Sequence, residues 1–383
     1  YSFDRRAGQS STLYLTPTRM IIEELHIVNF KSIAAADCRF SPKVNCLVGN
    51  NGMGKTNLLD ALHFLSFCRS HLSVPDNMVV RHGEEMALLQ GLYRDESGDG
   101  IELLLSIRPG KHKVLRRNKK EYERLSDHIG HFPLVIVSPQ DYQLILGGSD
   151  ERRRFMDQQL CQQDPRYLSA LIQYNRHLQQ RNTMLKQDRH DDALMDVLEL
   201  QMGSYAAEIY NKRSRFIEDF LPVFNDLYSD ISGSAEKVSL SYRSHLADGI
   251  PLEELLRRSR PKDYLLGFSS CGVHKDELEM LLGGVLIRKI GSEGQNKTFL
   301  ISMKLAQFRH QQLHGDETPI LLLDDIFDKL DATRVERIIR LVGGNGFGQI
   351  FITDTNRKNL DEIIASWSED YRLFEIENGQ IFQ

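Results

Sequence analysis

The segment Gly49-Asn50-Asn51-Gly52-Met53-Gly54-Lys55-Thr56 constrains the fold more than any other part of the chain. It fits the pattern G-x-x-x-x-G-K-[ST], in which glycines turn successive backbone N–H groups toward phosphate oxygens and the next helix adds its positive dipole. Residues 44–48 predict a strand before it, and apolar residues at 58, 61, 62 and 65 predict a buried helical face after it. This context disfavours the alternative of a chance glycine turn. We therefore predict an ATP site, in which Lys55 neutralises phosphate charge and Thr56 coordinates magnesium.

A second part of this site is predicted far downstream, where the apolar run 320–323 leads into Asp324 and Asp325. Such a run is typical of a buried parallel strand. Asp324 would hold the metal through water, and Asp325 would orient or deprotonate the attacking water, because phosphoryl transfer depends mainly on positioning and charge. Acidic pairs after apolar strands are also common as plain turns, so this prediction depends on the phosphate loop.

Residues Gly291-Ser292-Glu293-Gly294-Gln295 precede a long amphipathic helix and predict a second phosphate-binding helix start. An ordinary N-cap is the competing explanation. A chain with one phosphate loop does not need another for the same nucleotide. We therefore expect this segment to complete the site of a neighbouring copy.

Composition excludes several classes of protein. The chain has 383 residues, 41% of them hydrophobic and 26% charged, and no apolar run approaches the roughly 20 residues of a membrane span. We expect a soluble, cytoplasmic protein with no membrane partner. The five cysteines are scattered without Cys-x-x-Cys spacing, which indicates neither a zinc site nor a disulfide framework.

The pattern of apolar residues predicts an α/β chain with an insertion. Strand-like segments at 22–30, 87–93, 101–107 and 134–137 make residues 20–149 β-rich. Helical spacing dominates residues 150–265, where Pro222 is expected to end or kink a long helix, and buried-strand runs return in residues 266–383. We predict a nucleotide-binding head built from both ends of the chain around a mostly helical domain. Residues 1–19, which are polar and precede Met20, are expected to be a disordered extension.

The densest basic stretch lies in a predicted hairpin between residues 107 and 134. Because the formal net charge is -5, DNA binding would have to come from such local patches, although most charge runs are ordinary solvated surface. Residues 152–154 form a second basic run. The candidate DNA-binding residues are Lys111, Lys113, Arg116, Arg117, Lys119 and Lys120.

The order of phosphate loop, Ser-x-Gly-Gln and apolar strand with two aspartates resembles the ABC-type ATPases of the SMC-like branch. Further motifs are N-F-K-S at 29–32, N-L-L-D-A at 57–61, R-R-R-F-M-D at 152–157, G-V-H-K-D-E-L at 272–278 and L-L-D-D at 322–325. Together with the phosphate loop, they resemble those of the bacterial RecF family. The resemblance extends from Met20 to Gln383. It implies an ABC-type P-loop ATPase head with an inserted helical domain.

The resemblance also implies a function in recombinational DNA repair and replication-fork maintenance. ATP would drive a head-to-tail homodimer that clasps double-stranded DNA or single-strand/double-strand junctions, and a weak DNA-stimulated ATPase would act as a timer. RecR, together with RecO, would be the partners in loading recombinase at single-strand gaps. The alternatives are a transporter ATPase, an SMC-like structural ATPase and a non-enzymatic DNA-binding scaffold.

By resemblance, more residues join the site. Ser292 and Gly294 would contact the γ-phosphate of the partner's ATP, and Asp328-Lys329-Leu330-Asp331 would lie at the dimer seam. No histidine follows the strand 350–353, so the switch position falls to Thr353, Asp354 or Thr355. His274 and Lys275 would reach the nucleotide or the seam, or form a structural turn. The predicted catalytic residues are Lys55 and Asp325, the metal residues are Thr56, Asp324 and Gln140, and the nucleotide-binding residues are Asn29, Lys31, Ser32, Gly49, Asn50, Asn51, Gly52, Met53, Gly54, Lys55, Thr56, Asn57, Ser292, Gly294 and Gln295.

Overall fold

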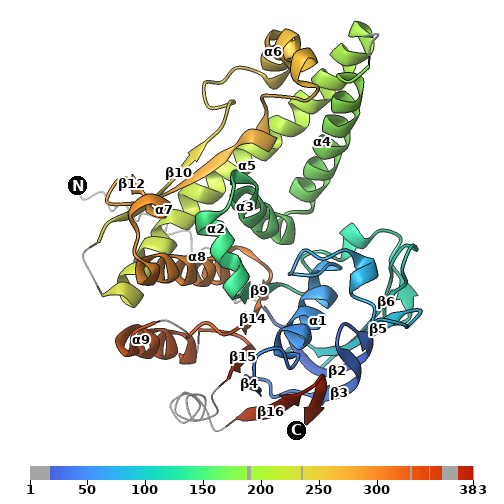
Figure 1. The fold of residues 1–383 in the computed structure, drawn as a ribbon, viewed down its shortest axis with the longest axis vertical. Coiled ribbons are helices and arrows are strands. Elements are labelled where there is room, and N and C mark those ends of the chain that lie inside the picture. Colours follow the sequence, from blue (N-terminus) through green and yellow to red (C-terminus); the bar gives the residue numbers. More distant parts are fainter. Residues whose placement is uncertain are drawn as a thin grey trace, which may run out of the picture.

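The computed structural model describes residues 18–187, 191–233, 236–327, 330–344, 346–355 and 370–382. Two six-stranded sheets form one end of the molecule, and long helices extend away from them as an arm (Figure 1). We call helices α4, α5 and α6 the helical arm. No helix in these described ranges is both long enough and apolar enough to cross a membrane.

The first sheet carries the phosphate loop and is mainly parallel, with the strand order β17-β16-β4-β15-β14-β9. Strands β4, β15, β14 and β9 are almost fully buried, which explains their continuous apolar runs, because both faces are covered. The carboxyl ends of β4, β15 and β14 lie at one edge, where ligands bind in open α/β sheets. The strands are β4 (Val44–Val48), β9 (Leu134–Val137), β14 (Ile320–Leu323), β15 (Ile350–Asp354), β16 (Tyr371–Glu377) and β17 (Gln380–Phe382).

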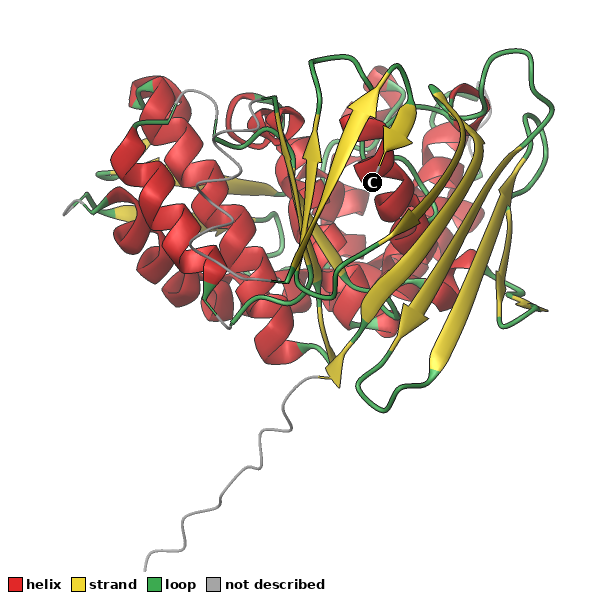
Figure 2. Ribbon diagram, turned by 90° about the horizontal axis from the view of Figure 1, so that it is seen from below, coloured by secondary structure: helices red, strands yellow, loops and turns green. Residues whose placement is uncertain are grey.

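The second sheet is antiparallel and has the order β3-β2-β5-β6-β7-β8, and Figure 2 shows its strands side by side in a long layer. Helix α1 (Lys55–Phe67) packs between the two sheets, since one apolar cluster contains side chains from α1 and from both. Residues 58–67 of α1 are therefore all buried, including the polar residues Asp60, His63 and Ser66. The strands are β2 (Ile21–Phe30), β3 (Ile33–Arg39), β5 (Ala87–Arg94), β6 (Gly100–Ile107), β7 (Val114–Arg117) and β8 (Lys120–Glu121).

The opposite face of the parallel sheet packs against α8 (Glu293–His314), and the arm rests on α8 through α5. Of the two expectations for Pro222, an end of the helix is wrong, because α5 is continuous through it from Asp192 to Ser232. Phe220 and Phe224 on either side are fully buried, and the Phe224 ring lies 4.8 Å from that of Phe299 in α8. We attribute the continuity to this packing, which offsets the roughly 3 kcal/mol cost of an interior proline.

The remaining elements connect these layers. A three-stranded sheet, β10-β11-β12, runs along α5. The helices are α2 (Gln143–Leu146), α3 (Ser149–Gln163), α4 (Pro165–Met184), α6 (Leu252–Leu266), α7 (Ile287–Ile290) and α9 (Ala332–Gly343). The short strands are β1 (Thr18–Arg19), β10 (Val238–Arg243), β11 (Glu277–Leu282), β12 (Val285–Leu286) and β13 (Glu317–Thr318), and the 3-10 turns are η1 (Asp76–Met78), η2 (Leu125–His128), η3 (Pro139–Tyr142) and η4 (Val273–Lys275).

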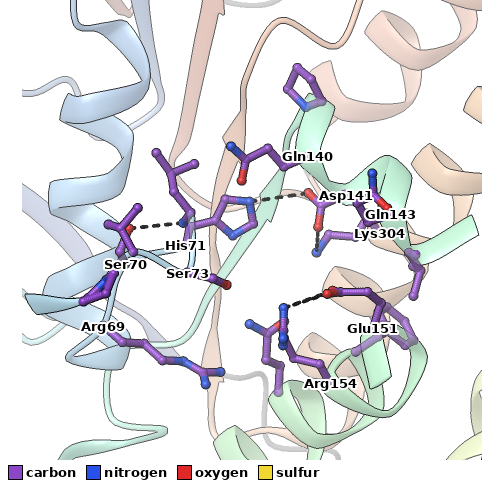
Figure 3. A pocket seen from close by; sticks show the side chains of 17 residues that line it. Arg69, Ser70, His71, Ser73, Gln140, Asp141, Gln143, Glu151, Arg154 and Lys304 are labelled. Carbon is purple, nitrogen blue, oxygen red and sulfur yellow. Dashed lines mark hydrogen bonds and ion pairs between the residues drawn. The ribbon is translucent and has the colours of Figure 1, made fainter. Parts of the chain in front are cut away.

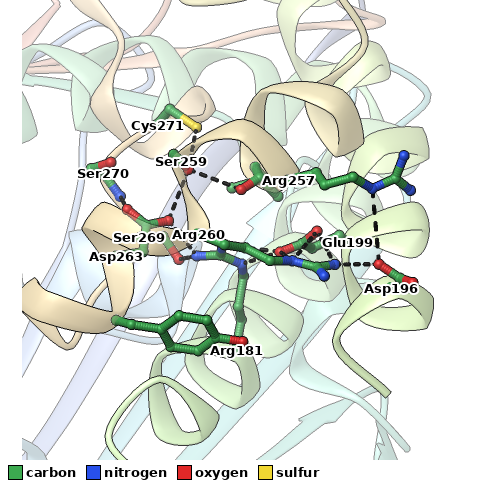
Figure 4. A network of polar contacts seen from close by, with 12 residues as sticks. Arg181, Asp196, Glu199, Arg257, Ser259, Arg260, Asp263, Ser269, Ser270 and Cys271 are labelled. Carbon is green, nitrogen blue, oxygen red and sulfur yellow. Dashed lines mark hydrogen bonds and ion pairs between the residues drawn. The ribbon is translucent and has the colours of Figure 1, made fainter. Parts of the chain in front are cut away.

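A buried ion-pair network joins the three arm helices at the end far from the sheets (Figure 4). Arg181 of α4 contacts Asp263 of α6 at 2.8 Å and Glu199 of α5 at 3.0 Å. Arg260 reaches the same Glu199 at 2.6 Å. Buried charges are tolerated when they are paired in this way, so the network fixes how the helices meet.

Most of the predicted strands are confirmed, including those at 87–93, 101–107 and 134–137, each within one residue at either end. One correction concerns the expected extension. Thr18–Arg19 form a strand paired in parallel with Glu317–Thr318, while residues 1–17 lie outside the described ranges. The division into a head of 20–149 and 266–383 and an inserted domain of 150–265 stays a prediction.

Candidate nucleotide-binding site

The phosphate loop (residues 49–56) joins the end of β4 to the start of α1. Gly52 and Gly54 have φ angles of 82° and 113°, a region that glycine enters without steric cost. At Gly49 the reason for glycine is space, because a Cβ there would lie 2.3 Å from the backbone oxygen of Ile376. The Lys55 ammonium donates to the carbonyls of Gly49 at 2.6 Å and Asn50 at 3.3 Å, so it lies curled beneath the loop.

The acidic edge of the sheet meets this loop directly. The Thr56 hydroxyl donates to Oδ2 of Asp324 at 2.9 Å, although 268 positions separate the two residues. Burial raises the pKa of the Asp324 carboxyl above its ordinary value, and hydrogen bonds from Thr353 and Thr56 act in the opposite direction. A threonine hydroxyl and a carboxylate are oxygen donors of the kind that Mg²⁺ prefers. These two residues therefore fit a magnesium ion.

Asp325 has a φ of 46°, an uncommon value for a residue with a side chain. Its backbone N–H donates to the Thr353 hydroxyl at 2.9 Å. A cavity of about 950 Å³ opens beside Asp325 and is also lined by Asn51, Asp354 and Thr355. Lys297 of α8, which sequence reasoning did not select, also lines this cavity. Its position two residues after Gln295 of the Ser-x-Gly-Gln segment is the signal that could have found it.

Four further predicted nucleotide residues are Asn57 in α1, Asn29 near the end of β2, and Lys31 and Ser32 in the turn after β2. The Asn57 amide donates to the Ser32 hydroxyl at 2.7 Å, next to the phosphate loop. Lys31 instead forms an ion pair of 2.6 Å with the buried Asp60 of α1, and Asn29 donates to Glu84. The structure thus places Ser32 and Asn57 beside the loop. The side chains of Lys31 and Asn29 instead bind Asp60 and Glu84.

The second predicted phosphate-binding segment forms the first turn of α8. The Ser292 hydroxyl accepts from the N–H of Gln295 at 3.2 Å, and the Gln295 side chain accepts from the N–H of Ser292 at 2.8 Å. This reciprocal capping leaves the remaining N–H groups of the turn available. Gln295 also donates to Glu236, and within the described part of the chain the Ser292 hydroxyl is bound by the N–H of Gln295 and not by the phosphate loop of its own chain.

Gln140 lies in the turn η3 and lines a different cavity, of about 910 Å³, between the loop after α1 and the helices α3 and α8 (Figure 3). His71 and Lys304 face the same space. His71 is 2.8 Å from the Ser138 hydroxyl, and Lys304 pairs with Asp141 at 3.2 Å. The structure therefore does not bring Gln140 into contact with Thr56 or Asp324. Sequence reasoning did not select Asp141 and Lys304, because they are far apart in the chain and only the fold brings them together as an ion pair.

The basic residues divide into exposed and engaged groups. Lys111, Lys119 and Lys120 are exposed on the hairpin around β7 and β8, whereas the Lys113 ammonium is bound by the carbonyl of Cys68 at 2.6 Å and by Asp76 at 2.9 Å. Arg116 is half exposed and pairs with Glu121, and Arg117 stacks on Phe132.

In the second basic run, residues 152–154, the first two arginines are engaged by the protein itself, while Arg154 is exposed and pairs with Glu151. Arg152 pairs with Glu277 at 2.5 Å, and Arg153 donates to the carbonyl of Asp276 at 2.8 Å. His274 is bound by Tyr174 at 2.7 Å, and burial lowers its pKa to about 4. Of the two explanations for His274, the contacts favour the structural turn. Asp328 and Lys329 of the predicted seam lie outside the described residues.

Comparisons with a protein-family profile and with curated proteins point to the same family. Residues 21–87 match the sequence profile of the RecF/RecN/SMC N terminal domain. The chain is 99% identical over 364 residues to the DNA replication and repair protein RecF of Porphyromonas gingivalis, covering 95% of this chain and 100% of that protein. It is 56% identical to RecF of Parabacteroides distasonis, covering 94% of this chain and 99% of that protein.

Solved structures show the same architecture. The recombination mediator protein RecF with ATP, from the RecFOR pathway, matches with a TM-score of 0.84 at 27% identity over 95% of this chain and 99% of that one. The Smc head domain of Pyrococcus furiosus matches with a TM-score of 0.56 at 16% identity over 94% of this chain and 95% of that one, which shows a shared fold only. The expected ABC-type ATPase fold is confirmed, and the chain belongs to the RecF family of DNA replication and repair proteins.

Proposed function

We propose that this chain binds ATP with magnesium in the phosphate loop and hydrolyses it slowly as a switch for DNA binding. The observation that carries the proposal is the contact of Thr56 with Asp324, which joins the two halves of the site at 2.9 Å. The relatives described as RecF with ATP support the choice of nucleotide.

Different residues of the chain would bind the phosphates, hold the metal and act on the attacking water. The backbone N–H groups of the loop and the start of α1 bind the phosphates, and Lys55 leaves the loop carbonyls to neutralise their charge. Thr56 and Asp324 hold the magnesium ion, which would offset charge on the transferred phosphoryl group. Asp325 orients or deprotonates the attacking water.

A second copy of the chain would complete the site. Ser292 is exposed at the start of α8, and Gly294 and Gln295 are half-buried beside it. Helix starts with available N–H groups bind anions. We propose that this turn binds the γ-phosphate held by the partner subunit, so that ATP drives a head-to-tail dimer and hydrolysis releases it.

The dimer would then act on DNA in the cytoplasm. Exposed basic residues of the β7–β8 hairpin, Lys111, Lys119 and Lys120, can neutralise backbone phosphates of double-stranded DNA or of junctions. DNA would stimulate a weak ATPase. The RecFOR pathway named for the solved relatives supports RecR and RecO as partners in loading recombinase.

Sedimentation velocity with and without ATP and magnesium tests the proposal. The wild-type chain should double in mass with ATP, Lys55→Ala should stay monomeric because it binds no nucleotide, and Ser292→Arg should bind ATP yet stay monomeric. An equimolar mixture of Lys55→Ala and Ser292→Arg provides a sharper control, because one intact composite site can form between them. A wild type whose mass does not respond to ATP would show that the dimer switch is wrong.

A further inference from the structure

Thr353, the fourth residue of β15, lies between the two acidic residues of the site. The sheet register pairs Leu323 of β14 with Ile352, so Asp324 and Thr353 are the next positions along the two strands. On its other side Thr353 pairs with Leu47 of β4, two residues before the phosphate loop. Its side chain is fully buried.

One hydroxyl group contacts both acids. Thr353 Oγ1 donates to Oδ1 of Asp324 at 2.8 Å and accepts the backbone N–H of Asp325 at 2.9 Å. A hydroxyl has one donor and two acceptor positions, so both bonds can form at once. Since Thr56 holds Oδ2 of Asp324, the two oxygens of this carboxylate are oriented by two different hydroxyls.

The second bond acts on the backbone. Asp325 has the left-handed φ of 46°, and its N–H donates to Thr353. Non-glycine residues keep such angles where surrounding contacts determine them. Loss of the hydroxyl would free Oδ1 of Asp324 and the backbone N–H of Asp325, while Thr56 would still hold Oδ2.

We propose that Thr353 is a positioning residue for hydrolysis, which orients Asp324 toward the metal and sets the backbone angle from which Asp325 reaches the water. This inference rests on the proposed function. Of the three candidates at the end of β15, the inference concerns Thr353, because its hydroxyl bonds to Asp324 and to the Asp325 backbone, whereas Asp354 and Thr355 line the adjacent cavity. Thr353 acts on the acids and not on the phosphate.

The competing explanation is that Thr353 only fills space in the core. Two substitutions that differ in the hydroxyl group distinguish these explanations. Thr353→Val keeps the shape and removes the hydroxyl, and Thr353→Ser keeps the hydroxyl. ATP hydrolysis at saturating ATP is measured against magnesium concentration, and binding of a fluorescent ATP analogue is measured in EDTA. Thr318→Val, at a buried threonine of β13 away from the site, is the matched control.

We expect Thr353→Val to lower kcat by about 10- to 100-fold and to raise the half-activating magnesium concentration about tenfold or more, because it misplaces groups that hold the metal. Binding in EDTA should not change, Thr353→Ser should restore both properties, and Thr318→Val should match the wild type. If Thr353→Val does not fold, Thr353→Ala makes the same test.

Two results would overturn the inference alone: a Thr353→Val chain with the wild-type kcat and magnesium dependence, or a Thr353→Ser chain no better than Thr353→Val. A wild-type chain that binds no ATP would instead overturn the proposed function, and this inference with it.

Discussion

Asp263→Asn should loosen the outer end of the helical arm, because it removes one carboxylate from the buried network of Figure 4. Asp263 is fully buried and accepts hydrogen bonds from Arg181 at 2.8 Å, Ser259 at 2.9 Å and the N–H of Ser270 at 3.0 Å. After the change, Arg181 and Arg260 would share the single buried carboxylate of Glu199.

The structure sets the size of the effect. Breaking a buried ion pair by neutralising one partner costs about 3 to 5 kcal/mol, because an uncompensated charge stays away from water. Asp196→Asn is the matched control, since Asp196 belongs to the same network but its side chain is 51% exposed. Neutralising an exposed partner costs less than about 1 kcal/mol. Burial, not the number of contacts, should therefore decide the outcome.

Hydrogen exchange followed by mass spectrometry measures this locally, in peptides from the end of α4 and from α6. A loss of about 3 kcal/mol corresponds to exchange on the order of 100-fold faster for amides that open with the network, and Asp196→Asn should change it by less than about tenfold. Peptides of the parallel sheet serve as the internal reference. If the two variants speed exchange equally, burial does not set the strength of this network and the reasoning is refuted.

Three further predictions concern other parts of the chain. Gly49→Ala should lower the thermal stability of the nucleotide-free protein more than Gly52→Ala, since only the Cβ at position 49 meets a backbone atom, at 2.3 Å. The reverse order of melting temperatures would contradict this. Burial lowers the pKa of His128 to about 4, so below pH 6.5 the unfolded chain binds more protons at this residue than the folded chain does. The free energy of unfolding should therefore fall toward pH 4, by at most about 1.4 kcal/mol per pH unit for this residue. His128→Gln should make this fall with pH less steep. Lys120→Ala should reduce the salt dependence of DNA binding, measured by fluorescence anisotropy, by about one unit in slope, whereas Lys113→Ala, whose ammonium is already bound by Asp76, should leave the slope unchanged.

The features that sequence predicted correctly are those whose cause is local. A strand, a glycine-rich loop and an amphipathic helix follow one another within residues 44–67, and each leaves its pattern in consecutive residues. The apolar run before Asp324 is likewise a property of one buried strand. Pro222 shows where local patterns stop predicting the structure. The intrinsic cost of a proline in a helix can be read from the sequence, but the packing of Phe224 on α8 that offsets it cannot.

For a related reason, sequence alone did not separate exposed basic residues from those that pair within the protein. Charge runs indicate nucleic-acid contact only when the charges face solvent, and the partner of each charge comes from a distant segment. Arg152 pairs with Glu277, 125 positions away, and this bond turns a candidate DNA contact into part of the interior. Lys119 and Lys120 are exposed in the same fold.

Thr353 shows what the register of a sheet adds to a list of candidates. The sequence placed three polar residues after a buried strand and could not choose among them, because their relation to Asp324 depends on how β14 and β15 align. A shift of one residue would point the opposite face of β15 toward the acids, since side chains alternate along a strand. The observed pairing of Leu323 with Ile352 sets Thr353 beside Asp324, and the pairing of Thr353 with Leu47 sets both beside the phosphate loop. The register of three strands from the two ends of the chain therefore determines which residue can position the catalytic acids.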